Sequence, residues 1–101
     1  MLEEIAKVLE FRLKNPIPGE ELFKGPLLLQ VHQGSESETL LLTAKKLTLG
    51  KVFSSKSKMV IQLEDLQNLI DGHSALSSLL ICGKIQVEGN MQAVREFSSL
   101  V

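Results

Sequence analysis

The chain has 101 residues, of which 44% are hydrophobic and 23% charged, and its formal net charge is −1. This length predicts one domain over residues 1–101, and the near-neutral charge argues against general nucleic-acid binding, which requires the neutralisation of several phosphates. The single cysteine excludes an internal disulfide, and with an acidic N-terminal segment and no apolar run long enough to cross a bilayer it points to the cytoplasm.

The N-terminal segment is predicted to form a helix over residues 2–14. Apolar residues recur along one helical face: Leu2, Ile5, Leu9 and Leu13. Asn15 precedes a proline, which disfavours the α conformation and ends the helix. A loop that contains more prolines and glycines follows.

Four strand-like segments come next. Each alternates apolar and polar residues, the period of a strand with one buried face, over residues 26–33, 39–44, 47–53 and 59–63. Polar turns at residues 34–38 and 54–58 separate some of them. Short strands joined by polar turns favour an antiparallel meander.

The C-terminal third combines two helices with one more strand. The first helix, with acids in its first turn, is predicted to end at Gly72. Residues 73–81 are interpreted as an apolar turn, and residues 83–88 alternate as a fifth strand. Asn90 is a suitable N-cap for a last helix that reaches about Leu100.

Together these elements predict an α+β fold. Its centre is a five-stranded, mainly antiparallel sheet covered on one face by helices, with the other face largely solvated.

The same C-terminal third resembles the sterol carrier protein 2 (SCP-2) family. The family pattern combines an acidic-start helix ending in glycine with a Gly-Lys-aliphatic-x-aliphatic-x-Gly-Asp/Asn-Met strand and turn. The matching positions are Glu64, Asp65, Leu66, Leu69 and Gly72, then Gly83, Lys84, Ile85, Val87, Gly89, Asn90 and Met91.

The chain departs from the family pattern at three places. Gln62 replaces the usual Ser/Thr N-cap, the proline before the strand falls near Leu76, and Leu79-Leu80 replaces an Ala-Phe pair. The resemblance implies a hydrophobic tunnel for lipids between sheet and helices.

Few residues could carry chemistry. The sequence has no G-x-G-x-x-G, P-loop or G-x-S-x-G motif. His32 and His73 have no Cys or His at ligand spacing, which argues against a metal site. Asp71, His73 and Cys82 could be drawn as a catalytic set, but helix-stop and turn chemistry explains them more simply. We therefore expect no enzyme activity and no cofactor.

The leading hypothesis is non-enzymatic binding or transport of an apolar ligand, such as a fatty acyl chain, an isoprenoid or a sterol-like lipid. The candidate lining residues belong to helix faces and a connection opposite the sheet: Leu66, Ile70, Leu76, Leu80, Val94 and Phe97.

The alternative is an accessory interaction or dimerisation domain with a closed tunnel, supporting a lipid-related enzyme pathway. In that case a Met91, Val94 and Phe97 stripe would be exposed and would drive association, for example into a homodimer.

A group of lysines in a window without acids could contribute a weak contact with anionic membrane surfaces. These are Lys45, Lys46, Lys51, Lys56 and Lys58. The ordinary alternative is that they form the solvated side of strands and turns.

Overall fold

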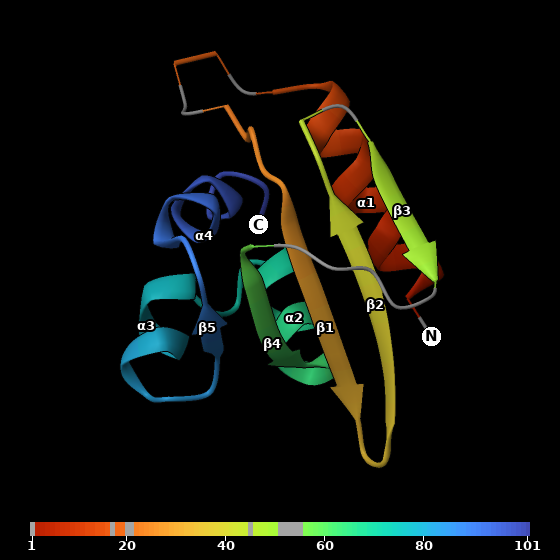
Figure 1. Cartoon of the computed structure of the whole chain (residues 1–101), viewed down its shortest axis with the longest axis vertical. Helices are drawn as coiled ribbons and strands as arrows, with labels where there is room; N and C mark the ends of the chain where they lie inside the picture. Colours follow the sequence, from red (N-terminus) through yellow and green to blue (C-terminus); the bar gives the residue numbers. More distant parts are fainter. Residues whose placement is uncertain (1, 17, 20–21, 45, 51–55) are drawn as a thin grey trace.

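A computed structural model describes residues 2–16, 18–19, 22–44, 46–50 and 56–101 of the chain. Within them the elements run in the order α1 (Glu3–Lys14), β1 (Leu27–Gln33), β2 (Glu36–Leu42), β3 (Leu47–Gly50), β4 (Lys58–Gln62), α2 (Leu63–Ile70), α3 (Leu76–Ile81), β5 (Gln86–Glu88) and α4 (Met91–Phe97) (Figure 1). This is the predicted α+β architecture.

The five strands form one mixed sheet in the order β3-β2-β1-β4-β5. The pairs β1–β2, β2–β3 and β4–β5 are antiparallel, which confirms a mainly antiparallel sheet. The predicted meander is wrong, however, because β1 pairs in parallel with β4. After the β2–β3 hairpin the chain returns to the opposite edge of β1, so the strand that comes first in sequence lies at the centre.

The β1–β2 connection is tighter than the predicted polar turn at residues 34–38. Gln33 pairs directly with Glu36, so only Gly34 and Ser35 lie between the strands. Gly34 has a φ of 61°, a conformation that glycine adopts without strain. Polar residues 36–38 therefore extend β2. The predicted turn at residues 54–58 lies partly outside the described residues.

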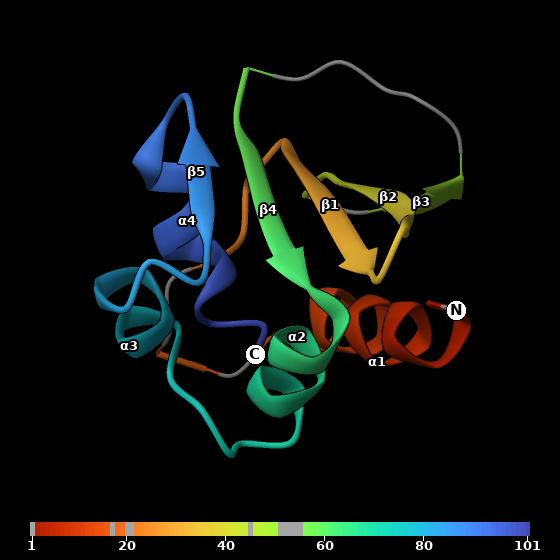
Figure 2. The ribbon, with the colours of Figure 1, turned by 90° about the horizontal axis from the view of Figure 1, so that it is seen from below.

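The helices cover one face of the sheet. Figure 2 shows α1 and α2 on the same side of the sheet, α1 beneath β1 and β2 and α2 beneath β4, with α4 beside β5. Alternate residues of the central strands point into this layer and are fully buried: Leu27, Leu29, Val31, Leu40, Leu42 and Met59. The helices contribute Ile5, Leu9, Leu66, Leu69, Val94 and Phe97 to the same cluster, and Leu2, the residue before α1, joins them.

The apolar turn predicted over residues 73–81 is wrong: most of it is the short helix α3. Gly83, expected to begin the fifth strand, instead ends α3 with a φ of 73°. The amide of Lys84 donates to the Leu79 carbonyl at 3.0 Å, and that of Gly83 to the Leu80 carbonyl at 3.2 Å, which is the Schellman pattern of a helix end. The strand β5 is consequently shortened to Gln86–Glu88.

Two other termini follow the sequence-based expectations. Gly72, at φ 79°, ends α2 in the same way, with the amide of His73 donating to the Asn68 carbonyl at 2.8 Å. Asn90 caps α4, its side-chain oxygen accepting from the Gln92 amide at 2.8 Å. Gln62 makes no side-chain cap hydrogen bond to α2.

The turn before α4 also explains a glycine of the strand-turn motif. Gly89 has a φ of 86°, and a Cβ placed there would collide with the backbone carbonyl of Lys56. Only glycine allows the β5–α4 turn to approach the segment leading into β4 so closely.

We predict that Gly89→Ala lowers the free energy of unfolding by about 3 kcal/mol, because it combines left-handed strain with a backbone collision. Gly72→Ala is the matched control: its φ is similar, but no atom lies within 4 Å of the added Cβ, so about 1 kcal/mol is expected. Urea denaturation measures both values. Equal losses for the two variants would contradict this explanation.

Candidate functional site

Two hollows in the described part of the chain are large enough to hold a small molecule. The first, of about 1310 Å³, lies at the N-terminal ends of α1 and α2, and polar side chains such as Glu64, Asp65, His32 and Lys84 line much of it. We call it the polar cleft. The second, of about 730 Å³, lies where α1 and α2 end and the C-terminus returns to them, and we call it the apolar pocket. An apolar ligand gains free energy only where its surface is removed from water, which favours the second.

The floor of the apolar pocket is the edge of the hydrophobic core. Leu69 and Leu100 line it and are 2% and 4% exposed, and Phe23, which is 6% exposed, lines the pocket from the loop before β1. Leu13 and Ile70 also line the pocket and are partly buried against the core. A hydrocarbon chain bound here would contact the core without opening the sheet.

The pocket lies at this end because several segments stop there together. The helix α1 ends at Lys14 and α2 at Ile70, while the loop before β1 and the last residues of the chain supply the other walls. Leu22, which is 56% exposed, belongs to the loop wall. An exposed leucine beside a partly buried floor leaves apolar surface available to a ligand.

Arg12 joins three of these segments at the rim of the pocket. Its Nη1 donates to the Leu100 carbonyl at 2.8 Å and its Nη2 to the Ile70 carbonyl at 3.2 Å. Ile70 is the last residue of α2, and backbone carbonyls in the last turn of a helix have no hydrogen-bond partner within that helix. A positive charge is also favourable at this end of the helix dipole. One side chain of α1 therefore fixes both the end of α2 and the C-terminal turn.

Glu96 connects the loop wall to α4. Its Oε1 accepts from the backbone amides of Lys24 at 2.8 Å and Gly25 at 3.2 Å, and its Oε2 accepts from the Gln92 side chain at 3.3 Å. Glu96 is only 4% exposed. Burial raises the pKa of this carboxyl. The hydrogen bonds from Lys24, Gln92 and Gly25 together lower the pKa by more than burial raises it, so the pKa lies below its ordinary range.

The residues proposed from the sequence as a lining are placed mainly in the core. Leu66, Leu76, Val94 and Phe97 are buried in one cluster, and Ile70 and Leu80 are partly buried against it. Ile70 also lines the apolar pocket; the other five do not. Their role in ligand binding stays a prediction.

Sequence reasoning missed the residues at the helix ends. Leu13 and Leu100 were assigned to helices without a binding role, and Leu22, Phe23 and Arg12 were not singled out. Arg12, Leu13 and Leu100 lie in or just after the last turn of a helix, which was the available signal, whereas Leu22 and Phe23 lie in the loop between α1 and β1, where no periodic pattern marks them.

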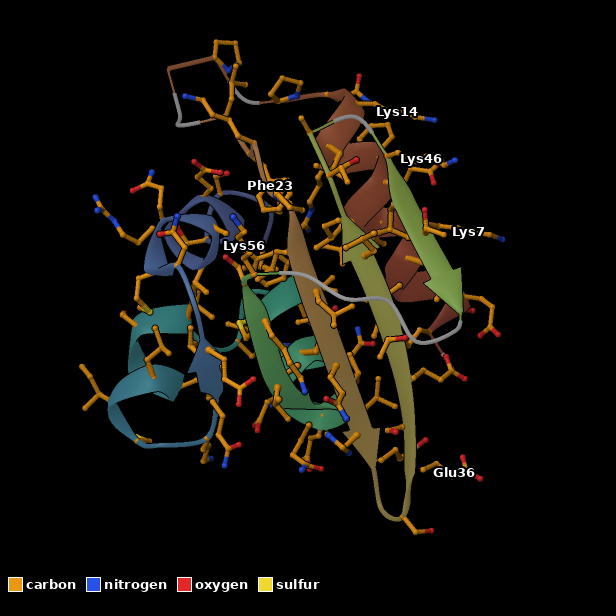
Figure 3. The ribbon with its side chains drawn as sticks, in the orientation of Figure 1. Lys7, Lys14, Phe23, Glu36, Lys46 and Lys56 are labelled. Carbon is orange, nitrogen blue, oxygen red and sulfur yellow. The ribbon has the colours of Figure 1, made fainter. Side chains whose placement is uncertain are left out.

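Neither the apolar stripe on the last helix nor the group of lysines predicted from the sequence forms one continuous surface among the described residues. Val94 and Phe97 are buried, so of the predicted stripe only Met91 is exposed, at 46%. Lys46 and Lys56 are exposed and Lys58 is partly buried, whereas Lys45 and Lys51 lie outside the described residues. Figure 3 shows Lys46 at β3 and Lys56 near the start of β4, on different parts of the molecule.

The described residues contain no group of three His, Cys, Asp or Glu side chains arranged to hold a metal ion. Among their helices, none has both the length and the hydrophobicity that a transmembrane span needs.

Comparison with known proteins identifies the fold. The sequence model of the SCP-2 sterol transfer family matches residues 1–101. No curated protein matches the chain.

Solved structures agree with this family match. The crystal structure of sterol carrier protein 2 like 2 from Aedes aegypti is 19% identical, with a TM-score of 0.81 over 99% of this chain and 95% of that one. The solution structure of palmitated SCP2L2 from the same mosquito is 20% identical, with a TM-score of 0.81 over 98% and 92%. The ubiquinone synthesis protein UbiJ-SCP2 is 18% identical, with a TM-score of 0.61 over 97% and 85%. At these identities the likeness establishes the fold.

We predict that Arg12→Met lowers the free energy of unfolding by about 1–2 kcal/mol, because two backbone carbonyls lose a charged donor but keep some access to water. Lys14→Met on the same helix is the control. Its exposed ion pair with Glu10, at 3.2 Å, should be worth less than about 0.5 kcal/mol. Chemical denaturation compares the variants, and equal effects would contradict a special role for Arg12.

The lowered pKa of Glu96 predicts an acid-dependent loss of stability. A depressed folded-state pKa stabilises the protein above the unfolded-state value, about 4.3 for glutamate, and this contribution is lost as the pH falls through the lower folded-state pKa. Glu96→Gln should therefore flatten the stability profile below about pH 4.3, measured by denaturation between neutral and acid pH. An unchanged profile would contradict the assignment.

Proposed function

The chain belongs to the SCP-2 sterol transfer family, and we propose that it binds the hydrocarbon chain of a lipid in the apolar pocket without catalysing a reaction on it. The observation that carries the proposal is a hollow of about 730 Å³ whose floor is the hydrophobic core itself. The palmitated mosquito protein of the same fold supports a fatty acyl chain as the ligand class.

The volume and lining suit such a ligand. Small-molecule sites typically measure about 300–1,000 Å³ and are mostly apolar with a few polar groups. Burying about ten methylenes at roughly 0.8 kcal/mol each would contribute about 8 kcal/mol. That corresponds to a dissociation constant of about 1 μM before the costs of ordering are subtracted.

Two cationic residues, Arg12 and Lys24, and one acidic residue, Asp71, line the pocket, so positive charge predominates among its side chains. A lipid carboxylate left at the rim would meet these cations while its chain enters the floor. Selectivity among chain lengths should be low, because an apolar pocket distinguishes single methylenes only weakly. A longer chain would extend toward the predicted lining residues of the core, including Leu66 and Phe97.

An accessory interaction role is the second candidate. Two observations favour it: five of the six predicted lining residues do not line the pocket, and the fold is shared with UbiJ-SCP2, described as a ubiquinone synthesis protein. In this case the family fold would serve a protein partner, and no lipid would need to bind.

Native mass spectrometry with palmitate separates the two candidates. We predict one bound palmitate per wild-type chain and at least about tenfold weaker binding for Ile70→Trp, because the indole fills the pocket. Ile81→Trp is the matched control, since Ile81 is 86% exposed and does not line the pocket. It should bind as the wild type does.

Absence of binding to the wild type would reject lipid binding and favour the accessory role. Equal binding by wild type and both variants would place the ligand elsewhere.

A further inference from the structure

The loop wall of the apolar pocket has no partner strand. Leu22, Phe23 and Lys24 line the pocket and precede β1, outside any helix or strand. Backbone amides in such a segment need an acceptor when they are withdrawn from water. The carboxylate of Glu96 supplies it, accepting from both Lys24 and Gly25.

Glu96 is also the one buried charged residue in the described part of the chain. Burying a carboxylate costs free energy unless it is hydrogen-bonded, and Glu96 has three donors. Replacing it by an apolar residue would leave the amides of Lys24 and Gly25 without this acceptor. The side chain therefore has a specific local task, to hold residues 22–25 against α4.

The opposite walls are fixed through the same C-terminal turn. The hydroxyl of Ser99 donates to the Glu96 carbonyl at 2.7 Å, and the next residue, Leu100, accepts from Arg12. Hydrogen bonds link Lys24 to Glu96 and Glu96 to Ser99, the peptide bond joins Ser99 to Leu100, and Arg12 then links Leu100 to Ile70. Between described residues, no backbone–backbone hydrogen bond holds residues 22–25, so we expect this segment to open before the helix ends that the other bonds join.

From these contacts we infer that Glu96 is a positioning residue that holds the wall formed by residues 22–24 closed over the apolar pocket, and so sets the rate of lipid exchange. The inference rests on the proposed function. Exchange of an apolar ligand requires a wall to move, and wall opening is a gating step that precedes both entry and exit. A gate held less firmly should speed both steps.

The distinguishing result is a change in rates without a comparable change in affinity. For Glu96→Leu, which removes the acceptor, we predict that the association and dissociation rates of cis-parinaric acid both rise at least about tenfold. The dissociation constant should change less than about threefold, because the floor residues are untouched. Stopped-flow fluorescence measures both rates.

Glu96→Gln tests the same idea with a milder change. Its amide oxygen can still accept from Lys24 and Gly25, so the rates should rise by less than in Glu96→Leu, a partial rescue by the conservative side chain. This variant also carries the test if Glu96→Leu does not fold, in which case rates equal to wild type would overturn the inference.

Asn90→Ala controls for general destabilisation. It removes the N-cap hydrogen bond to the Gln92 amide in the same helix, costing about 1 kcal/mol, and leaves the Glu96 carboxylate that accepts from Lys24 and Gly25 in place. Its exchange rates should equal those of the wild type.

Three results would overturn the inference: unchanged rates in Glu96→Leu, equal acceleration by Asn90→Ala, or a weaker affinity with an unchanged association rate. A wild type that does not bind cis-parinaric acid or palmitate at all would instead reject the proposed function, and the inference with it.

Discussion

The rest of the structure depends on the burial of the inner face of β1. Leu27, Leu29 and Val31 are fully buried there, and the strand has a partner on each side, β2 and β4. An apolar sheet face must be covered, and the helices do this with their own apolar stripes. The chain returns after β3 to place β4 on the free edge of β1, and the helices lie on the side of the sheet where the buried side chains of β1 point.

The apolar pocket is the place where this covering is incomplete. The helices α1 and α2 end before they meet the loop and the C-terminus, so part of the core edge is left as a floor. Polar groups complete the boundary: Arg12 satisfies carbonyls from two segments, and Glu96 satisfies amides from a third. The pocket is thus bounded by hydrogen bonds at its rim and by apolar contacts beneath, an arrangement suited to an amphiphilic ligand.

Sequence patterns predicted the features that depend on neighbouring residues. The apolar face of α1, the end of α2 at Gly72 and the cap at Asn90 follow from local chemistry, and so did the mainly antiparallel sheet. The parallel β1–β4 pair could not be predicted in this way, because it joins segments separated by a hairpin. The helix α3 has six residues and no side-chain cap, which leaves little periodicity to detect. Periodicity also shows which face of each helix turns toward the sheet, but not where the helices stop covering it. Ile70 was therefore proposed as a lining residue, while Leu13, Leu22 and Leu100 were missed.

Methyl NMR with a nitroxide-labelled fatty acid tests the location of the ligand most directly. If the lipid chain binds in the apolar pocket, paramagnetic broadening will be strongest at the methyl groups of Leu13, Ile70 and Leu100. It will be weak at Val60 and Leu63, which line the polar cleft. Broadening concentrated at Val60 and Leu63, or no broadening beyond that of the free label, would contradict lipid binding in this pocket.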